Sequence, residues 1–276
     1  MRTIEKSSLG CSLALLALLL LAPAPARAVD GVTLISSTTT SALLNCPAMS
    51  SFQLNLCRSG SYRLAGNFVA ASGYGIAITA PNVTLDLNGF SITAGANGGI
   101  SAIYGATDRL TVENGKVDGF SVGITLSGAG ERVDRVAVNA LGAAVEIGAG
   151  AISHCIATGG GVNTAGLTLN GDGALRDNVV TGFAYGLVAR GNDQISGNQV
   201  AVVVTGAETV AVTIGTGAVV NLFDNQITGP VAMQISGQVG YGANTFQTGG
   251  ANPALILSGG SATSMNNNAC LGAGPC

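Results

Sequence analysis

Short runs of alternating apolar and polar residues recur along the chain. The segment 75–89, GIAITAPNVTLDLNG, shows the unit: one such run, a turn at Pro81 and Asn82, a second run, and an Asn-Gly corner. Alternation with a period of two predicts β-strands that are buried on one face. Asn and Gly are typical of tight turns. Each unit is therefore expected to hold two or three short strands.

The unit repeats about every 22 residues. Its marker is a small residue followed by an apolar residue that opens the first strand. The apolar residues of successive markers are separated by 24, 24, 21, 22, 20, 25, 21 and 22 residues. Repeats of this length are typical of solenoids, in which each unit is one coil. The nine markers are Gly75-Ile76, Gly99-Ile100, Gly123-Ile124, Ala144-Val145, Gly166-Leu167, Gly186-Leu187, Ala211-Val212, Ala232-Met233 and Ala254-Leu255.

A polar corner closes most units after the second strand. Asparagine tolerates the left-handed backbone that such a corner needs, and asparagines stacked on successive coils can hydrogen-bond in a ladder. The same alignment places Cys155 in this inward column, where we expect a buried free thiol. The corner asparagines are Asn88, Asn114, Asn178, Asn198, Asn225, Asn244 and Asn267.

Leucine-rich repeats share the period, but they need a leucine signature and helical return segments. Every segment here is strand-like, and glycines interrupt any helical stretch. We therefore predict an all-β fold: a right-handed, single-stranded parallel β-helix of about nine to ten coils with an N-terminal cap.

The segments 60–67 (GSYRLAGN) and 82–92 (NVTLDLNGFSI) resemble the opening of bacterial parallel β-helix repeat proteins of the pectin-lyase-like superfamily. The likeness extends over roughly residues 60–268. It implies the β-helix fold but no single activity, because the superfamily hosts lyases, hydrolases, epimerases and adhesins.

The N-terminus has the pattern of a secretory signal peptide over residues 1–28. Arg2 and Lys6 precede an apolar core at 13–21, and Ala26-Arg27-Ala28 fits a cleavage site. We expect an exported protein, periplasmic or extracellular. The mature chain then divides into a cap segment at 29–59, the β-helix at 60–268 and a short tail at 269–276.

Cysteines lie near both ends of the mature chain. An exported protein can keep disulfides, and the economical pairing is Cys46 with Cys57 and Cys270 with Cys276, although sequence does not fix connectivity. The absence of C-x-x-C spacing argues against zinc or redox chemistry.

Charge is sparse, at 9% of residues, with a formal net charge of −3. Removal of residues 1–28 leaves 8 basic and 13 acidic residues and a net charge of −5. A mildly acidic chain without a basic cluster is a poor nucleic-acid binder. No apolar run beyond the signal peptide reaches the length of a membrane span.

Many enzymes of the superfamily work on the outward face of the first strands. The expected outward column contains one carboxylate, Glu146, whereas a glycoside hydrolase needs two. The acidic calcium cluster of family lyases and the epimerase signature are also missing. The column comprises Ala77, Ser101, Thr125, Glu146, Thr168, Val188, Thr213, Gln234 and Ile256.

The alignment of corners stacks Arg135, His154 and Asp177 on consecutive coils, about 5 Å apart. His154 is the only histidine, a residue type that titrates near neutrality. A histidine between Arg and Asp can act as an acid or base, but an exposed charge ladder would look the same. These three residues are the catalytic candidates.

Two further sets of candidates concern binding. Asn170, Asp172 and Asp193 fall at one turn of adjacent coils and offer oxygen ligands for Ca²⁺, although plain turn chemistry explains them equally well. No other cofactor is expected.

Exposed aromatic rings can cover the apolar faces of sugars, and the candidates are Tyr74, Tyr104, Tyr185 and Tyr241, together with Glu146.

Three functions remain open on the sequence. The first is a non-catalytic envelope or extracellular scaffold that binds polysaccharide or another cell-surface component. The second is a polysaccharide-active enzyme of the lyase or epimerase type. The third is an adhesin-like structural protein that associates end to end with copies of itself.

Overall fold

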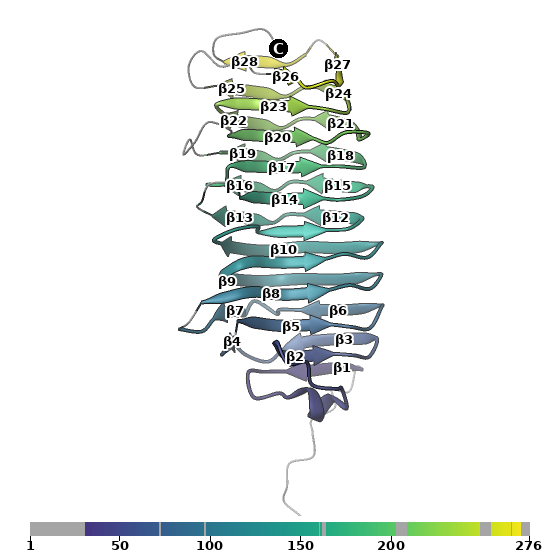
Figure 1. Ribbon diagram of the computed structural model, residues 1–276, viewed down its shortest axis with the longest axis vertical. Coiled ribbons are helices and arrows are strands. Elements are labelled where there is room, and N and C mark those ends of the chain that lie inside the picture. The colour runs from purple at the N-terminus through teal and green to yellow at the C-terminus, as the bar shows by residue number, and fades with distance from the viewer. Residues whose placement is uncertain are drawn as a thin grey trace, which may run out of the picture.

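Three parallel sheets wind around one apolar core in the computed structural model (Figure 1). The fold is an all-β parallel solenoid of about nine turns, which confirms the predicted fold class. The structure describes residues 31–71, 73–96, 98–159, 161, 164–202, 209–248, 255–265 and 267–271. The predicted signal peptide and Cys276 lie outside these residues.

Sheet 1 collects the first strand of each coil and faces the viewer in Figure 1. It contains β2 (Phe52–Leu56), β5 (Tyr74–Ile78), β8 (Gly99–Gly105), the end of β9 (Leu110–Leu126), β11 (Val145–Ile147), β14 (Ala165–Leu169), β17 (Tyr185–Ala189), β20 (Val210–Ile214), β23 (Val231–Ile235) and β26 (Leu255–Leu257).

Sheet 2 collects the second strand of each coil. It contains β1 (Val32–Ile35), β3 (Gly60–Leu64), β6 (Val83–Asp86), the start of β9, the start of β10 (Glu131–Ala140), β12 (Gly150–Ser153), β15 (Gly173–Arg176), β18 (Asn192–Ser196), β21 (Val219–Phe223), β24 (Gln238–Gly242) and β27 (Ser261–Ser264).

Sheet 3 closes each coil. It contains β4 (Phe68–Ala70), β7 (Ser91–Ala94), the middle of β9, the end of β10, β13 (Ile156–Gly159), β16 (Val179–Thr181), β19 (Gln199–Ala201), β22 (Gln226–Gly229), β25 (Thr245–Thr248) and β28 (Ala269–Leu271).

The small residue of the repeat is required by the backbone of the next coil. A Cβ atom on Gly75 would lie 2.4 Å from the Ala102 carbonyl oxygen, and a Cβ on Gly123 would lie 2.4 Å from that of Ala144. Both distances are shorter than van der Waals contact. Only glycine or alanine is found at this position from Gly75 to Ala232, because a larger side chain would separate the coils.

The coil at β8 departs from the predicted register. Ile76 pairs with Ile103 and Ala77 with Tyr104, so the small residue of this coil is Ala102 and not Gly99. The spacing from Gly75 is therefore 27 residues. Gly99-Ile100 and Ala102-Ile103 carry the same pattern, and the sequence did not distinguish them. The outward column consequently contains Tyr104 where Ser101 was expected.

One left-handed residue turns the chain between sheets 2 and 3 on most coils. We call this set the corner column: Asn114, Arg135, His154, Asp177, Gly197, Asp224 and Ala243, with φ between 53° and 69°. Adjacent strand registers place these residues on successive coils. The predicted stacking of Arg135, His154 and Asp177 is therefore confirmed.

A second column points inward beside the corner column and forms the predicted asparagine ladder. The side-chain amide nitrogens of Asn178, Asn198 and Asn225 each donate to the side-chain oxygen on the next coil, at 2.9 Å. Asn244 continues the ladder to Asn268 at 3.2 Å. Asn268, not Asn267, is thus the ladder residue, while Asn88 and Asn114 have the left-handed backbone of corner residues.

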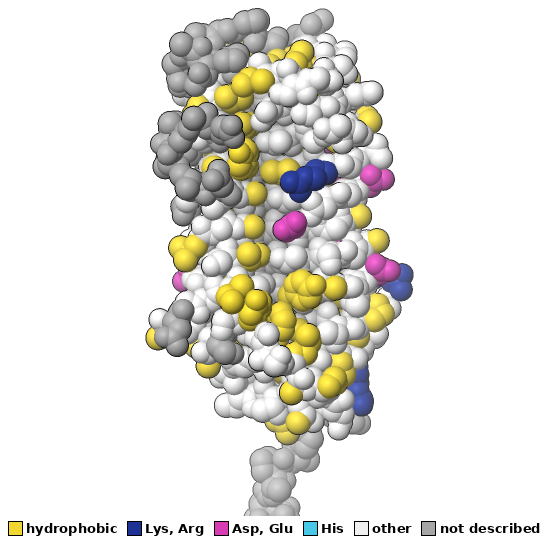
Figure 2. All heavy atoms as spheres, in the orientation of Figure 1, with side chains coloured by type: hydrophobic (Ala, Val, Ile, Leu, Met, Phe, Trp, Pro, Cys, Tyr) yellow, Lys and Arg dark blue, Asp and Glu magenta, His cyan; other side chains and the backbone are white. Residues whose placement is uncertain are grey.

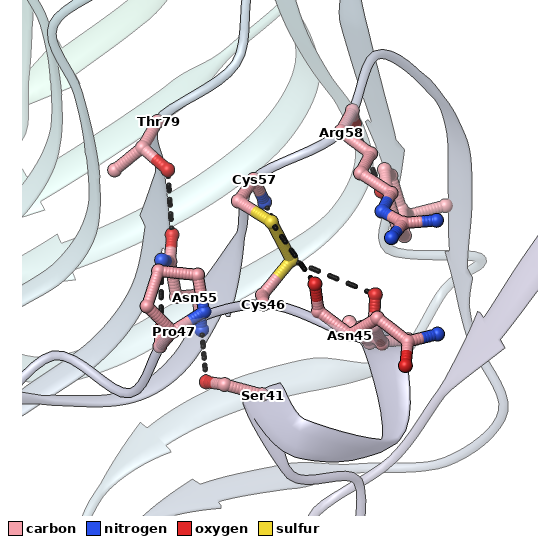
Figure 3. Close-up of a disulfide and its surroundings, with 10 residues drawn as sticks. Ser41, Asn45, Cys46, Pro47, Asn55, Cys57, Arg58 and Thr79 are labelled. Atoms are coloured by element: carbon pink, nitrogen blue, oxygen red, sulfur yellow. Dashed lines mark hydrogen bonds between the residues drawn. A yellow bond between two sulfur atoms is a disulfide. The ribbon is translucent and has the colours of Figure 1, made fainter.

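The N-terminal segment confirms one predicted disulfide. Cys46 and Cys57 are bonded (Figure 3), and in the same region the Ser41 hydroxyl accepts a hydrogen bond from the backbone of Asn55. A short 3-10 helix, η1 (Ser41–Leu44), lies in this cap. The sheets nevertheless begin with β1 and β2, inside the predicted cap at 29–59, and end with β28, inside the predicted tail.

Candidate functional site

Aromatic rings gather on the outward face of sheet 1 over its first coils. The ring centres of Phe52 and Tyr74 are 4.8 Å apart, and those of Phe52 and Tyr104 are 5.9 Å apart. Tyr104 is 38% exposed, and Ile100, whose side chain lies against Gly73, is 51% exposed. Figure 2 shows apolar side chains gathered on the N-terminal half of this face. We call Phe52, Tyr74, Ile100 and Tyr104 the aromatic patch.

A polar chain of side chains lies farther along the same sheet. The Glu146 carboxylate accepts a hydrogen bond from the Asn170 amide at 2.7 Å. The Asn170 oxygen in turn accepts one from Arg190. Glu146 is two coils beyond Tyr104 in one column. The patch is thus followed by groups that can hydrogen-bond to hydroxyls.

The remaining tyrosine candidates, Tyr185 and Tyr241, differ in exposure. Tyr185 occupies a later coil in the column of Tyr74 and is partly exposed. Tyr241 is 4% exposed and packs edge-on against Phe246 in the core. Tyr241 is therefore inaccessible to a ligand and leaves the set of candidates.

A buried carboxylate, Asp134, is the centre of the corner cluster. Its Oδ1 accepts hydrogen bonds from the Ser153 hydroxyl at 2.8 Å and from His154 Nδ1 at 2.9 Å. Its Oδ2 faces Arg132 at 3.1 Å and is also paired with Arg135. None of the Asp134 side chain is exposed, whereas those of His154 and Arg135 are about half exposed.

The surroundings of Asp134 keep it ionised. Burial by itself would raise the pKa of this carboxyl, but the hydrogen bonds from His154 and Ser153 and the charges of Arg135 and Arg132 outweigh burial and lower its pKa below 3.8. Sequence reasoning missed this residue because strand alternation points it outward. The sequence does place Asp134 directly before the candidate Arg135, and this neighbouring opposite charge could have pointed to it.

Charges on the adjacent coils extend the cluster in both directions. Arg135 Nε donates to the Asn114 side chain at 2.8 Å, and its Nη2 lies 3.7 Å from Glu113. On the other side, His154 Nε2 lies 3.8 Å from the carboxylate of Asp177. The three predicted catalytic candidates are therefore brought together, with Asp134 beneath them.

A shallow groove of about 490 Å³ runs along sheet 3 beside this cluster. Lys116, Ala137 and Ile156, two positions after the corner residues Asn114, Arg135 and His154, are among the groove residues. Asp118 and Asn139 are joined across it by a 2.7 Å hydrogen bond. The corner cluster thus lies beside an open groove that is lined by both polar and apolar residues.

The proposed calcium ligands do not converge. Asp172 is exposed and accepts hydrogen bonds from the backbone and side chain of Asn192. Asp193 lies beside Gly173, the residue after Asp172, and not beside Asp172 itself. Asp193 is 1% exposed. Asn170 is already bonded to Glu146 and Arg190. Within the described ranges, no three His, Cys, Asp or Glu side chains lie close enough to hold a metal ion.

Two carboxyls are buried in one inward column at the entry to sheet 2. Burial raises the pKa of Glu131, although backbone amides of Gly128 and Gly148 bind its oxygens. Burial also raises the pKa of Asp193 to about 6. Asp193 Oδ1 has no hydrogen-bond partner, and its Oδ2 accepts from the Gly191 amide.

Cys155 is a free, buried thiol, as predicted. Burial raises its pKa to about 11, and it lies at the end of the asparagine ladder, where its amide donates to Asn178. Such a thiol packs as a small apolar group and is not a nucleophile.

In the part of the chain that the structure describes, no helix combines the length and hydropathy needed to cross a bilayer. Comparison with protein-family models, with curated proteins and with solved structures gives no match.

Proposed function

We propose that this chain is an exported polysaccharide-binding protein whose binding surface is the aromatic patch on sheet 1. The signal-peptide pattern supports export. The motifs in 60–67 and 82–92 support a place in the pectin-lyase-like superfamily, many of whose members act on polysaccharides. The binding role is inferred from the surface residues of this chain and not from the superfamily.

The three-ring cluster carries the proposal. An aromatic ring offers a flat apolar face that can cover the C–H face of a sugar, and it loses little conformational freedom on binding. The ring of Phe52 contacts the rings of both Tyr74 and Tyr104, and Tyr104 remains 38% exposed. Glu146 and Asn170 lie along the same sheet, where sugar hydroxyls would need partners.

Affinity electrophoresis of the mature protein in gels that contain neutral or acidic polysaccharides tests this proposal. We expect retardation by at least one polymer and a loss of affinity of about tenfold in Tyr104→Ala, which corresponds to about 1.4 kcal/mol. Val219→Ala is the matched control, because Val219 is 45% exposed on sheet 2. It should bind as the wild type does.

Two outcomes oppose the proposal. Equal affinity of Tyr104→Ala and the wild type removes the aromatic patch as the binding surface. A protein that binds none of the polymers and has a solution mass of several chains supports the self-associating structural role instead.

A further inference from the structure

The apolar core is exposed at the C-terminal coil of the solenoid. Leu257 of β26 lies in an inward column that continues Ile214 and Ile235 of the two preceding coils. Both isoleucines are fully buried, whereas Leu257 is 58% exposed, because no described strand lies on the next coil. Met265 and Leu271, which belong to the same coil, are also more than half exposed. The C-terminal coil therefore presents an apolar end surface.

The main chain of this coil has open strand edges. Among the strands that the structure describes, β26, β27 and β28 pair with β23, β24 and β25 and with no strand on their other side (Figure 1). An open edge can pair with another chain, and natural proteins often protect it with charged residues or proline. The sequences of these three strands, LIL, SATS and ACL, contain neither. A strand of another chain can therefore add to these edges.

The charge pattern indicates which chain fits. Residues 225–276 contain no Asp, Glu, Lys, Arg or His, so Asp224, two coils before β27, is the last charged side chain. In a twofold interface each surface meets its own equivalent, and a charged surface would meet its own sign. An uncharged end has no such repulsion. The C-terminal coil is thus complementary to a second copy of itself.

The N-terminal end of the solenoid is covered and does not offer a matching surface. Leu44, at the end of η1, packs against the core, and the Ser41 hydroxyl accepts a hydrogen bond from the Asn55 amide. The disulfide between Cys46 and Cys57 holds the same segment. Head-to-tail stacking would place the open edges of one copy against this cap. Contact between two C-terminal coils avoids it.

We propose that the C-terminal coil is the interface of a twofold dimer, in which β26, β27 and β28 pair with the same strands of a second copy of this chain. A twofold axis across the coil sets one strand against its own copy and exchanges the other two, so every pair is antiparallel. β26 and β28 have three residues each and β27 has four, so β27 is the strand on the axis. Leu257 then lies in a core that continues through both copies. The aromatic patch is on the first coils, so the dimer does not depend on polysaccharide binding.

Sedimentation velocity of the mature protein over a range of concentrations tests the dimer. We expect the mass of two chains for the wild type. Thr263 is an exposed residue of β27, and Thr263→Lys places two like charges close to the axis. This variant should raise the dissociation constant by about 100-fold or more. Asn221→Lys is the matched control, because Asn221 is exposed in the same outward column two coils earlier. It should remain a dimer.

Leu257→Lys is a second variant, which places a charge at the end of the core column. It should also sediment as a monomer, and amide hydrogen exchange in β27 should be faster than in the wild type. A far-ultraviolet circular dichroism spectrum like that of the wild type shows that the coils remain folded in both lysine variants. Binding of polysaccharide should be unchanged in Thr263→Lys, so the dimer and the aromatic patch are tested separately.

Three outcomes overturn the proposal. A wild type with the mass of one chain at every concentration means that something other than a second copy covers the coil. A mass that keeps growing with concentration indicates head-to-tail stacking. A dimer that persists in Thr263→Lys and Leu257→Lys, or that dissociates equally in Asn221→Lys, has its interface elsewhere.

Discussion

The Asp134 carboxylate accepts a hydrogen bond from Nδ1 of His154, one coil farther along the solenoid, at 2.9 Å. Because the chain contains one histidine, its imidazole gives an isolated signal in long-range ¹H–¹⁵N NMR spectra. In the neutral form of the ring we expect the hydrogen to be on Nδ1. In Asp134→Asn this preference should weaken, since an amide can either donate or accept. A wild-type ring protonated on Nε2 would contradict the assignment.

The same carboxylate should contribute stability that depends on pH. Its pKa in the folded chain lies below 3.8, so the unfolded chain binds the proton more tightly. The contribution is present above about pH 4 and is lost as pH falls through the lowered pKa. We expect Asp134→Asn to cost about 1–3 kcal/mol at pH 7 and much less at pH 3. Urea unfolding at both pH values measures the difference, and an equal loss at the two would contradict it.

The asparagine ladder predicts a large effect from one buried amide. Asn198 is fully buried; its oxygen accepts from the backbone and side chain of Asn178, and its nitrogen donates to Asn225 and to two backbone carbonyls. Asn198→Ala leaves several of these groups unpaired, each at a cost of about 1–3 kcal/mol. We expect a drop in the unfolding midpoint and faster amide exchange in the adjoining coils.

Asn221→Ala provides the comparison for the ladder. Asn221 is exposed on sheet 2, one coil beyond Gln194. Its replacement should change the free energy of unfolding by about 0.5 kcal/mol or less. If the two alanine variants unfold alike, the ladder contributes little beyond the backbone pairing.

The fold was predictable because the same physical requirement recurs in every coil. The small residue at Gly75 and Gly123 makes room for a carbonyl oxygen of the next coil, and the alternating aliphatic residues fill one core. A constraint repeated at a nearly fixed period is visible in a single sequence. Among the first strands that the structure describes, β8, where two markers lie three residues apart, was assigned the wrong register.

The candidate sites were less predictable because they depend on neighbours from other coils. Strand alternation treats Asp134 as an exposed residue, yet Arg132, Arg135 and His154 cover it completely. Phe52 was assigned to the cap for the same reason: its contact with Tyr104 appears only once β2, β5 and β8 are stacked. A register error of three residues is enough to hide such a contact.

The buried thiol of Cys155 should be inert in the folded protein. Its side chain is 1% exposed, and burial raises its pKa to about 11, so little thiolate is present at pH 8. Alkylation with iodoacetamide, followed by peptide mass mapping, should leave Cys155 unmodified in buffer and modify it in denaturant. Rapid labelling in buffer would show that the coils at this level open readily.

Asp193 should destabilise the fold at neutral pH. Its pKa rises from 3.8 to about 6 on folding, chiefly because the carboxyl is buried, so the folded chain binds the proton more tightly. The contribution of Asp193 to stability is therefore most favourable below about pH 4 and falls as pH rises from about 4 to about 6. Asp193→Asn removes the charge and keeps an acceptor for the Gly191 amide. We expect it to add about 1–3 kcal/mol at pH 8 and little at pH 4, measured by urea unfolding against the exposed Asp224→Asn. A variant that is no more stable than the wild type at pH 8 would mean that the charge is solvated or paired in solution.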